Sequence, residues 1–177
     1  MVSTYFDNLI SAMSLLAEQP NSIFIGQAVK YEGTSLYHTL KHLPEEKRLE
    51  IPVAENMQLG MSIGLSLQGY LPVSIFPRWN FLLSATDQLV NHLDKLSEMS
   101  QGEYNPKVII RTSIGSEKPL WPGKQQTGDF SEAFDMMLEN IPVIRLDNAE
   151  MIVPEYQKAT ERKGSTILVE YADKYNE

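Results

Sequence analysis

Glu55 is the residue whose type and setting could most directly do chemistry. It follows the apolar extended run Ile51–Ala54 and begins an apolar, glycine-containing stretch with helical spacing. A carboxylate in this place lies near the positive end of a helix dipole and is partly desolvated. It could exchange a proton with a ligand, or it could be a helix-end carboxylate with no chemistry. The spacing alone favours the second interpretation, because acidic residues are common at helix starts.

Aromatic side chains form the second candidate group. Phe76, Trp79 and Phe81 follow an apolar run and could make a platform for a flat ligand. Packing in the core is the commoner role of such residues, so this alternative stays open at the level of the sequence.

The three histidines show no spacing typical of a metal site. His38 and His42 are four residues apart and could share one face of a helix, but no third ligand is evident near them or near His92. We therefore expect no metal in this chain. A nucleophile elbow, a phosphate-binding Gly-Lys-Ser/Thr loop and a dinucleotide fingerprint are also missing from the sequence.

The elements that must position these residues alternate along the chain. Short apolar runs typical of buried strands occupy Ser22–Gly26, Leu71–Phe76, Lys107–Arg111, Ile141–Leu146 and Thr166–Glu170. Stretches with helical spacing start near Phe6, with Ser3 or Thr4 as the cap, and recur over Asn56–Gln68, Phe81–Met99, Asp129–Leu138 and Ala149–Arg162. This alternation predicts an α/β fold, a mostly parallel sheet with helices on both faces.

Ligands of such sheets gather where the carboxyl ends of strands meet the amino ends of helices. Three junctions of this kind are evident, at Gly26–Val29, Val53–Asn56 and Phe76–Phe81. The longest irregular stretch is Ser113–Gly128, and a loop of this length in a compact domain is usually functional.

Length and composition narrow the class of protein. The 177 residues suit one domain, and 42% hydrophobic with 21% charged residues is ordinary for a globular protein. A net charge of −8 without basic clusters disfavours binding to nucleic acid. The chain has no cysteine, no signal-peptide pattern at its amino end and no apolar run long enough for a bilayer, so we expect a cytoplasmic protein that does not enter the membrane.

At the three junctions the chain resembles the pyrimidine-binding domain of thiamine-diphosphate enzymes. The resemblance is to the beta subunits of pyruvate dehydrogenase-type 2-oxo-acid dehydrogenases and, more distantly, to transketolase, and it runs from Tyr5 to Tyr171. Lys47–Glu55 is similar to the family's motif ending in Pro-x-x-Glu, and Phe76–Lys95 to its second motif. Gly60, Gly64, Tyr31-Glu32-Gly33 and Ile109-Ile110-Arg111 also fit, in the family's order.

The resemblance implies roles for individual residues. Glu55 would hydrogen-bond the pyrimidine nitrogen N1′ of thiamine diphosphate, which favours the imino tautomer that removes the thiazolium C2 proton. Phe81 would stack on the pyrimidine, and Pro77 would line its edge.

Two positions depart from the family pattern. The family usually has an acidic residue where this chain has Gln27, so a cofactor contact would keep a hydrogen bond but lose a charge. It also has a histidine near the substrate, whose place is taken by Gln126. A glutamine donates hydrogen bonds but shuttles no proton, which argues against standard oxidative decarboxylation with transfer to a lipoyl arm.

The resemblance also implies a second chain. We expect the whole of 1–177 to be one transketolase-like pyrimidine-binding domain, without the family's carboxyl-terminal domain and without a diphosphate-binding domain. A separate diphosphate-binding subunit would then hold the diphosphate through Mg²⁺ in a hetero-oligomer or dimer. The helix Phe81–Met99 and the loop around Trp121 are the expected contact surfaces.

Two hypotheses follow. In the first, the chain is the pyrimidine-binding subunit of a split thiamine-diphosphate enzyme, inactive alone, acting on a 2-oxo acid or a ketose as an oxidoreductase or transferase. In the second, it is a catalytically silent relative that assembles or regulates other subunits, which the departures at Gln27 and Gln126 favour.

Overall fold

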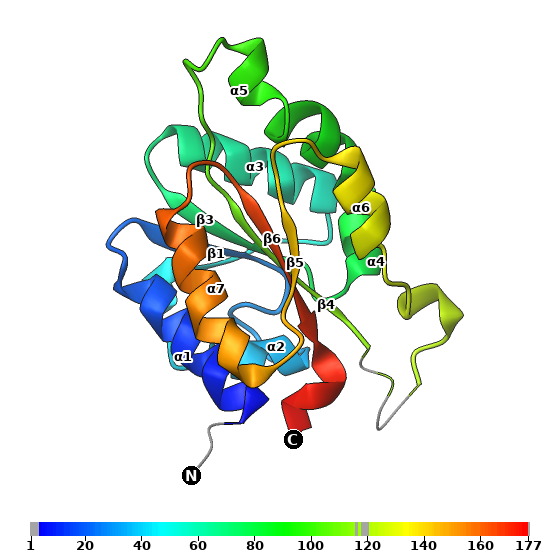
Figure 1. The fold of residues 1–177 in the computed structure, drawn as a ribbon. Helices are drawn as coiled ribbons and strands as arrows, with labels where there is room; N and C mark the ends of the chain where they lie inside the picture. Colours follow the sequence, from blue (N-terminus) through cyan, green and yellow to red (C-terminus); the bar gives the residue numbers. More distant parts are fainter. Residues whose placement is uncertain (1–3, 116, 118–120, 177) are drawn as a thin grey trace.

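A six-stranded sheet, parallel throughout, forms the centre of the computed structural model, which describes residues 4–115, 117 and 121–176. The strand order is β2-β1-β3-β4-β6-β5 (Figure 1). The strands are β1 (Ser22–Gly26), β2 (Arg48–Glu50), β3 (Leu71–Ile75), β4 (Ile109–Ile114), β5 (Val143–Arg145) and β6 (Thr166–Tyr171). The predicted α/β fold class is confirmed.

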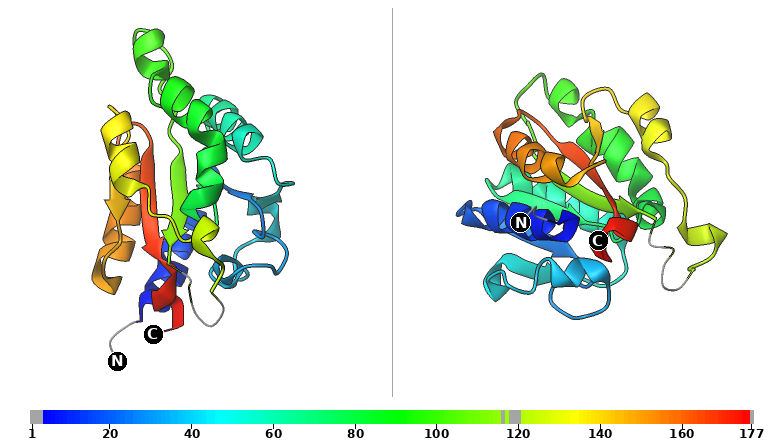
Figure 2. Two further views of the ribbon diagram at one scale, coloured as in Figure 1. Left: turned by 90° about the vertical axis from the view of Figure 1, so that its right-hand side faces the viewer. Right: turned by 60° about the horizontal axis from the view of Figure 1, so that its bottom comes forward.

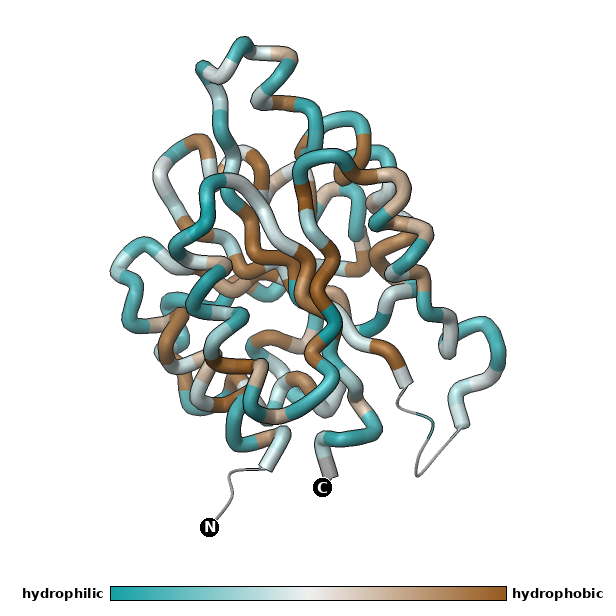
Figure 3. Tube along the Cα trace, in the orientation of Figure 1, coloured by the Kyte–Doolittle hydropathy of each residue, from teal (hydrophilic) through white to brown (hydrophobic). Residues whose placement is uncertain are grey.

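Helices cover both faces of the sheet and bury a separate apolar cluster on each. On one face, α1 (Tyr5–Glu18), α2 (Ser35–His38) and α7 (Ala149–Glu161) pack with the closing turn η5 (Ala172–Asn176). The other face carries α3 (Glu55–Leu67), α4 (Trp79–Leu82) and α6 (Ser131–Met137). Helices α1 and α7 lie side by side (Figures 1 and 2), and the most apolar segments run through the central strands (Figure 3).

The predicted start of the first helix is confirmed. The Thr4 side chain accepts a hydrogen bond from the backbone N–H of Asp7, and the Asp7 carboxylate accepts one from the backbone N–H of Thr4. This capping box satisfies donors that the first turn leaves open. The alternative cap, Ser3, lies outside the described residues.

The edge strand β2 was not predicted. Its three residues, Arg48, Leu49 and Glu50, contain only one apolar side chain and all are half-buried. An apolar-run criterion finds strands buried on both faces, and β2 lies at the edge of the sheet. The predicted strands are confirmed, with bounds shifted most at β4, which begins two residues after Lys107, and at β5.

The predicted helical character of Phe81–Met99 is confirmed, but the segment is not one regular α-helix. This segment is divided into α4, the turn η2 (Leu83–Ala85), a π-helical turn η3 (Gln88–Leu93) and α5 (Leu96–Met99). Asp94, directly after the π-helical turn, is buried, and its carboxylate accepts hydrogen bonds from the backbone N–H groups of Glu139 and Asn140 at 3.1 and 2.8 Å. The break therefore places a buried carboxylate against the segment after α6.

The histidine pair also differs from expectation. Helix α2 ends at His38, so His38 and His42 do not share a helix face. His42 Nε2 lies 2.8 Å from Ser14 Oγ, and His38 Nε2 lies 3.5 Å from Glu32 Oε1. Across residues 4–115, 117 and 121–176 there is neither a metal-ligating group of three His, Asp or Glu side chains nor a helix long and apolar enough to cross a membrane.

Candidate functional site

The five predicted site residues all follow the carboxyl ends of strands. Gln27 follows β1, Glu55 follows β2, Pro77 and Phe81 follow β3, and Gln126 lies in the long segment after β4. In a parallel sheet these ends lie at one edge, which is where ligands of such folds bind.

Glu55 is the first residue of α3 and only 9% of its surface is exposed. Its Oε1 accepts a hydrogen bond from Gln27 Nε2 at 3.4 Å. Within the described part of the chain, Oε2 has no hydrogen-bond partner. A nearly buried carboxylate with one oxygen that has no hydrogen-bond partner can bind a nitrogen of a ligand, because a buried polar group without a hydrogen bond is energetically unfavourable.

The loop that carries Gln27 approaches β3 closely. At Gly26, the last residue of β1, an added Cβ would lie 2.5 Å from the carbonyl oxygen of Ile75. Gln58, one turn into α3, fills the remaining space: its Nε2 donates to the carbonyl of Ile75 at 2.9 Å and to Ser74 Oγ at 3.1 Å. These contacts lock α3, and so Glu55, against β1 and β3.

Of the three aromatic residues, only Phe81 is available to a ligand. Phe76 and Trp79 are buried in the core, where the Trp79 ring stacks on Phe134 with centroids 4.9 Å apart. Trp79 Nε1 also donates to Ser131 Oγ at 3.1 Å. The predicted core role therefore holds for Phe76 and Trp79, while Phe81 is half-buried and lines a cavity.

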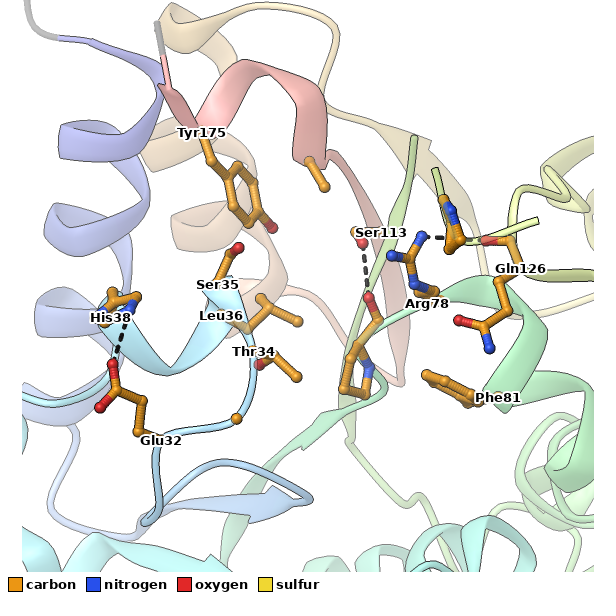
Figure 4. A pocket seen from close by; sticks show the side chains of 14 residues that line it. Glu32, Thr34, Ser35, Leu36, His38, Arg78, Phe81, Ser113, Gln126 and Tyr175 are labelled. Carbon is orange, nitrogen blue, oxygen red and sulfur yellow. Dashed lines mark hydrogen bonds and ion pairs between the residues drawn. The ribbon is translucent and has the colours of Figure 1, made fainter. Parts of the chain in front are cut away.

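This cavity has a volume of about 650 Å³ and brings together three of the predicted residues, Phe81, Pro77 and Gln126 (Figure 4). Arg78 and Ser113 lie on the same side as Phe81 and Gln126, and Tyr175, Thr34 and Ser35 lie opposite. Glu55 and Gln27 are not among the residues that line it. They form a separate contact at the same edge of the sheet.

Hydrogen bonds fix the Phe81 side of the cavity. Arg78 Nη1 donates to the carbonyls of Gly115 and Gln126 at 2.9 and 3.2 Å, and Ser113 Oγ donates to the carbonyl of Pro77 at 2.7 Å. Burial lowers the pKa of Arg78 from its ordinary value, and the negative charge of Asp173 opposes that effect. Arg78 therefore ties the long segment after β4 to the end of β3.

The opposite side of the cavity also carries polar side chains. Thr34, Ser35 and His38 line it, and the His38 side chain lies against the Glu32 carboxylate. Thr34 Oγ1 is buried without a hydrogen-bond partner among the described residues. A bound hydroxylated ligand or a water molecule would satisfy it.

The sequence did not indicate Arg78 or Tyr175 as site residues. Arg78 lies inside the predicted junction Phe76–Phe81, so its position in the sequence could have indicated a place in the site. Tyr175 carries no local signal, because only the packing of η5 against the sheet brings it to the cavity.

The parallel sheet with helices on both faces defines an α/β domain that carries a carboxylate and a half-buried aromatic ring at the carboxyl edge of its sheet. The chain belongs to the family of transketolase pyrimidine-binding domains, whose model matches residues 7–176. This family implies thiamine diphosphate as the cofactor.

Individual relatives agree with this family. The pyruvate dehydrogenase E1 component subunit beta of Cyanidium caldarium is 29% identical over 135 residues, covering 74% of this chain and 39% of the relative. The same subunit of Gracilaria tenuistipitata var. liui is 29% identical over 146 residues, covering 80% and 43%. A split-gene transketolase, solved as an inactive beta4 tetramer, has a similar fold with a TM-score of 0.72 and 16% identity, covering 94% of this chain and 50% of that one. The chain thus spans less than half of the length of these curated relatives.

The residues present fit the pyrimidine half of this cofactor. A nearly buried carboxylate offers an acceptor or a proton to a ring nitrogen, and Phe81 offers a flat apolar face. The described residues contain no group of three His, Asp or Glu side chains that could hold a metal ion.

Proposed function

We propose that this chain supplies the aminopyrimidine-binding half of a thiamine-diphosphate site and that a separate chain supplies the diphosphate half with its Mg²⁺. The observation that carries the proposal is Glu55, 9% exposed at the start of α3 with one carboxylate oxygen open. Thiamine diphosphate, when bound, supplies a carbon nucleophile and an electron sink for cleaving the bond next to a carbonyl.

The chain's own residues would prepare that chemistry. Glu55 holds a proton at its open oxygen against the pyrimidine ring nitrogen N1′, and the Gln27 amide steadies the other oxygen. Phe81 gives the ring a flat face and Pro77 bounds its edge. The open oxygen of Glu55 would then share its proton with the ring nitrogen of the bound ligand.

The substrate would enter the cavity beside Phe81. This space is walled by Gln126 and Arg78 on one side and by Thr34, Ser35 and His38 on the other. We propose a 2-oxo acid or a ketose as the substrate, since both classes carry a carbonyl and further polar groups that can hydrogen-bond to these side chains. Gln126 would hydrogen-bond it without moving a proton.

Exposed apolar side chains support a partner chain. Val53 is 75% exposed just before Glu55, and Met57 and Met61 on α3 are 44% and 37% exposed. Trp121 is 56% exposed in the segment after β4. Large exposed apolar groups mark contact surfaces, so we propose that the diphosphate-binding subunit covers α3 and Trp121.

The test is co-expression with a diphosphate-binding subunit from the same organism, followed by addition of thiamine diphosphate and Mg²⁺. Exchange of the C2 proton of the bound cofactor with deuterium is then followed by NMR. Glu55→Ala should slow exchange by at least about 100-fold, the usual effect of removing a proton-transfer group. Glu46→Gln, which removes an exposed carboxylate of the turn η1 (Glu45–Lys47), should exchange like the wild type. Equal exchange by Glu55→Ala and the wild type would show that the assigned role is wrong.

The second candidate function is a silent subunit that assembles or regulates others. Glutamines at positions 27 and 126 favour it, because neither can take a charge or move a proton. In that case no complex containing this chain would exchange the C2 proton at Glu55-dependent rates, while removal of the chain would change the partner's assembly or activity.

A further inference from the structure

Glu50, the last residue of β2, holds the loop after β1 through three consecutive backbone amides. Its Oε1 accepts a hydrogen bond from the N–H of Ala28 at 2.7 Å, and its Oε2 accepts from the N–H groups of Val29 and Lys30, both at 2.8 Å. Hydrogen bonds to an ionised carboxylate are stronger than those between neutral groups, so this contact fixes the loop firmly.

The loop has the backbone shape that this contact needs. Ala28 has φ of +54°, in the left-handed region that residues other than glycine seldom adopt. That turn points successive N–H groups to one side and makes a concavity that attracts an anion. Here the anion is part of the chain, because Glu50 fills the concavity. Arg48, from the same strand, adds a hydrogen bond from Nη1 to the carbonyl of Val29 at 3.2 Å.

Gln27 stands directly before the three amides that Glu50 holds. Its backbone is therefore fixed between Gly26, pressed against β3, and the loop bound to β2. From this position its side chain reaches Glu55 Oε1. Glu50 does not line the cavity, and the partners of its carboxylate are the amides of Ala28, Val29 and Lys30. The route from this carboxylate to Glu55 by hydrogen bonds therefore leads through the loop that carries Gln27.

We infer that Glu50 is a positioning residue that sets Gln27 against Glu55. The inference rests on the proposed function of Glu55, and it assigns a role to a carboxylate outside the predicted site. Without Glu50 the Ala28–Lys30 amides lose their acceptor, the left-handed turn at Ala28 loses its support and the Gln27 amide no longer stays near Glu55.

The first test needs only this chain. Amide hydrogen exchange at Ala28, Val29 and Lys30 should be at least about 10-fold faster in Glu50→Gln than in the wild type, because a glutamine offers one acceptor oxygen where the carboxylate offers two. In Glu50→Gln, the ¹³C chemical shift of the Glu55 carboxyl group should move toward the value measured in the variant Gln27→Ala, in which the contact with Glu55 is removed. Glu46→Gln, four residues before Glu50 and exposed, should change neither signal. If Glu50→Gln does not fold, Glu50→Asp gives the same comparison with a smaller change in the same direction.

A merely structural role for Glu50 would give a different result. Faster exchange at all core amides with an unmoved Glu55 carboxyl signal would overturn the inference. The double variant Gln27→Ala, Glu50→Gln gives a second check. If its shift of the Glu55 signal equals the sum of the shifts in the two single variants, the inference is also overturned, because substitutions that act through one contact do not have additive effects.

The second test uses the complex with the diphosphate-binding subunit and separates the inference from the proposed function. Glu50→Gln and Gln27→Ala should slow C2 proton exchange by the same factor, within about twofold, and the double variant by no more than either. If Glu55→Ala abolishes exchange while Glu50→Gln leaves it unchanged, the inference fails and the proposed function stands. If Glu55→Ala has no effect, the proposed function fails, and the signals measured on the chain alone still decide whether Glu50 positions Gln27.

Discussion

Arg111 on β4 and Glu170 on β6 form an ion pair with both side chains fully buried, with Nε to Oε1 at 2.5 Å and Nη2 to Oε2 at 3.0 Å. Tyr156 and Tyr175 donate their hydroxyl hydrogens to Glu170, and Arg111 Nη1 donates to Thr39 Oγ1. Burial, the largest single effect, would lower the pKa of Arg111, but Glu170, Tyr156 and Tyr175 together raise it above its ordinary value. Because Tyr175 also lines the cavity, this network joins the core to the site.

Removing one partner of this pair should cost much stability. Arg111→Met is expected to lower the free energy of unfolding by about 3–5 kcal/mol, since it leaves a buried charge without a partner. Denaturant unfolding followed by circular dichroism measures the change. Arg145→Met breaks the partly exposed pair with Asp129 and should cost about 1 kcal/mol or less. Equal losses in the two variants would contradict the structure.

The buried tyrosines predict instability at alkaline pH. Burial, and then the negative charge of Glu170, raise the pKa of Tyr5, Tyr156 and Tyr175. Above about pH 10 these tyrosines ionise in the unfolded chain but keep their protons in the folded one, so stability is present below that pH and is lost as pH rises. Each contributes a loss of about 1.4 kcal/mol per pH unit until its folded pKa is reached. The free energy of unfolding measured at several alkaline pH values should fall with this slope. Tyr156→Phe removes one of the ionising groups, so it should make the slope smaller by about 1.4 kcal/mol per pH unit.

Phe81 should matter for the cofactor more than for the fold. Phe81→Ala is expected to weaken binding of thiamine diphosphate to the assembled complex by about 3- to 10-fold, the value of one aromatic stacking contact. Calorimetric titration measures the affinity. Leu83→Ala, in the next turn and 39% exposed, removes a side chain of similar character and should leave the affinity unchanged. A matching loss in both variants would remove the reason to place the pyrimidine on Phe81.

Arg78 should order the segment that carries Gln126. Arg78→Met loses the hydrogen bonds to the carbonyls of Gly115 and Gln126, so amide exchange across residues 121–128 should speed up by about 10-fold or more. Mass spectrometry of exchanged peptides reads this directly. Lys124→Met removes an exposed positive charge from the segment itself and should leave its exchange rate as it is. Unchanged exchange in Arg78→Met would mean that other contacts hold the segment.

Strands buried on both faces could be predicted because their apolar side chains are a local property. Ser22–Gly26 and Thr166–Tyr171 are interior strands of the sheet, and most of their side chains are buried. The edge strand Arg48–Glu50 escaped prediction because one of its sides meets solvent. The π-helical turn within Phe81–Met99 also escaped prediction, and so did the contact of the following Asp94 with the distant Glu139–Asn140 backbone.

The sequence by itself determined the alternation of strands and helices, the family motifs and the place of Glu55 at the start of a helix, because these depend on residues close together in the chain. The tertiary structure decided which residues meet. Phe76 and Trp79 are buried in the core, whereas Phe81 lines the cavity. Glu50 contacts the loop that follows Gln27, and Tyr175 lies across the cavity from Arg78. Such pairings follow from strand order and helix packing, which bring together segments far apart in the chain. The spacing of residues within one segment therefore cannot predict them.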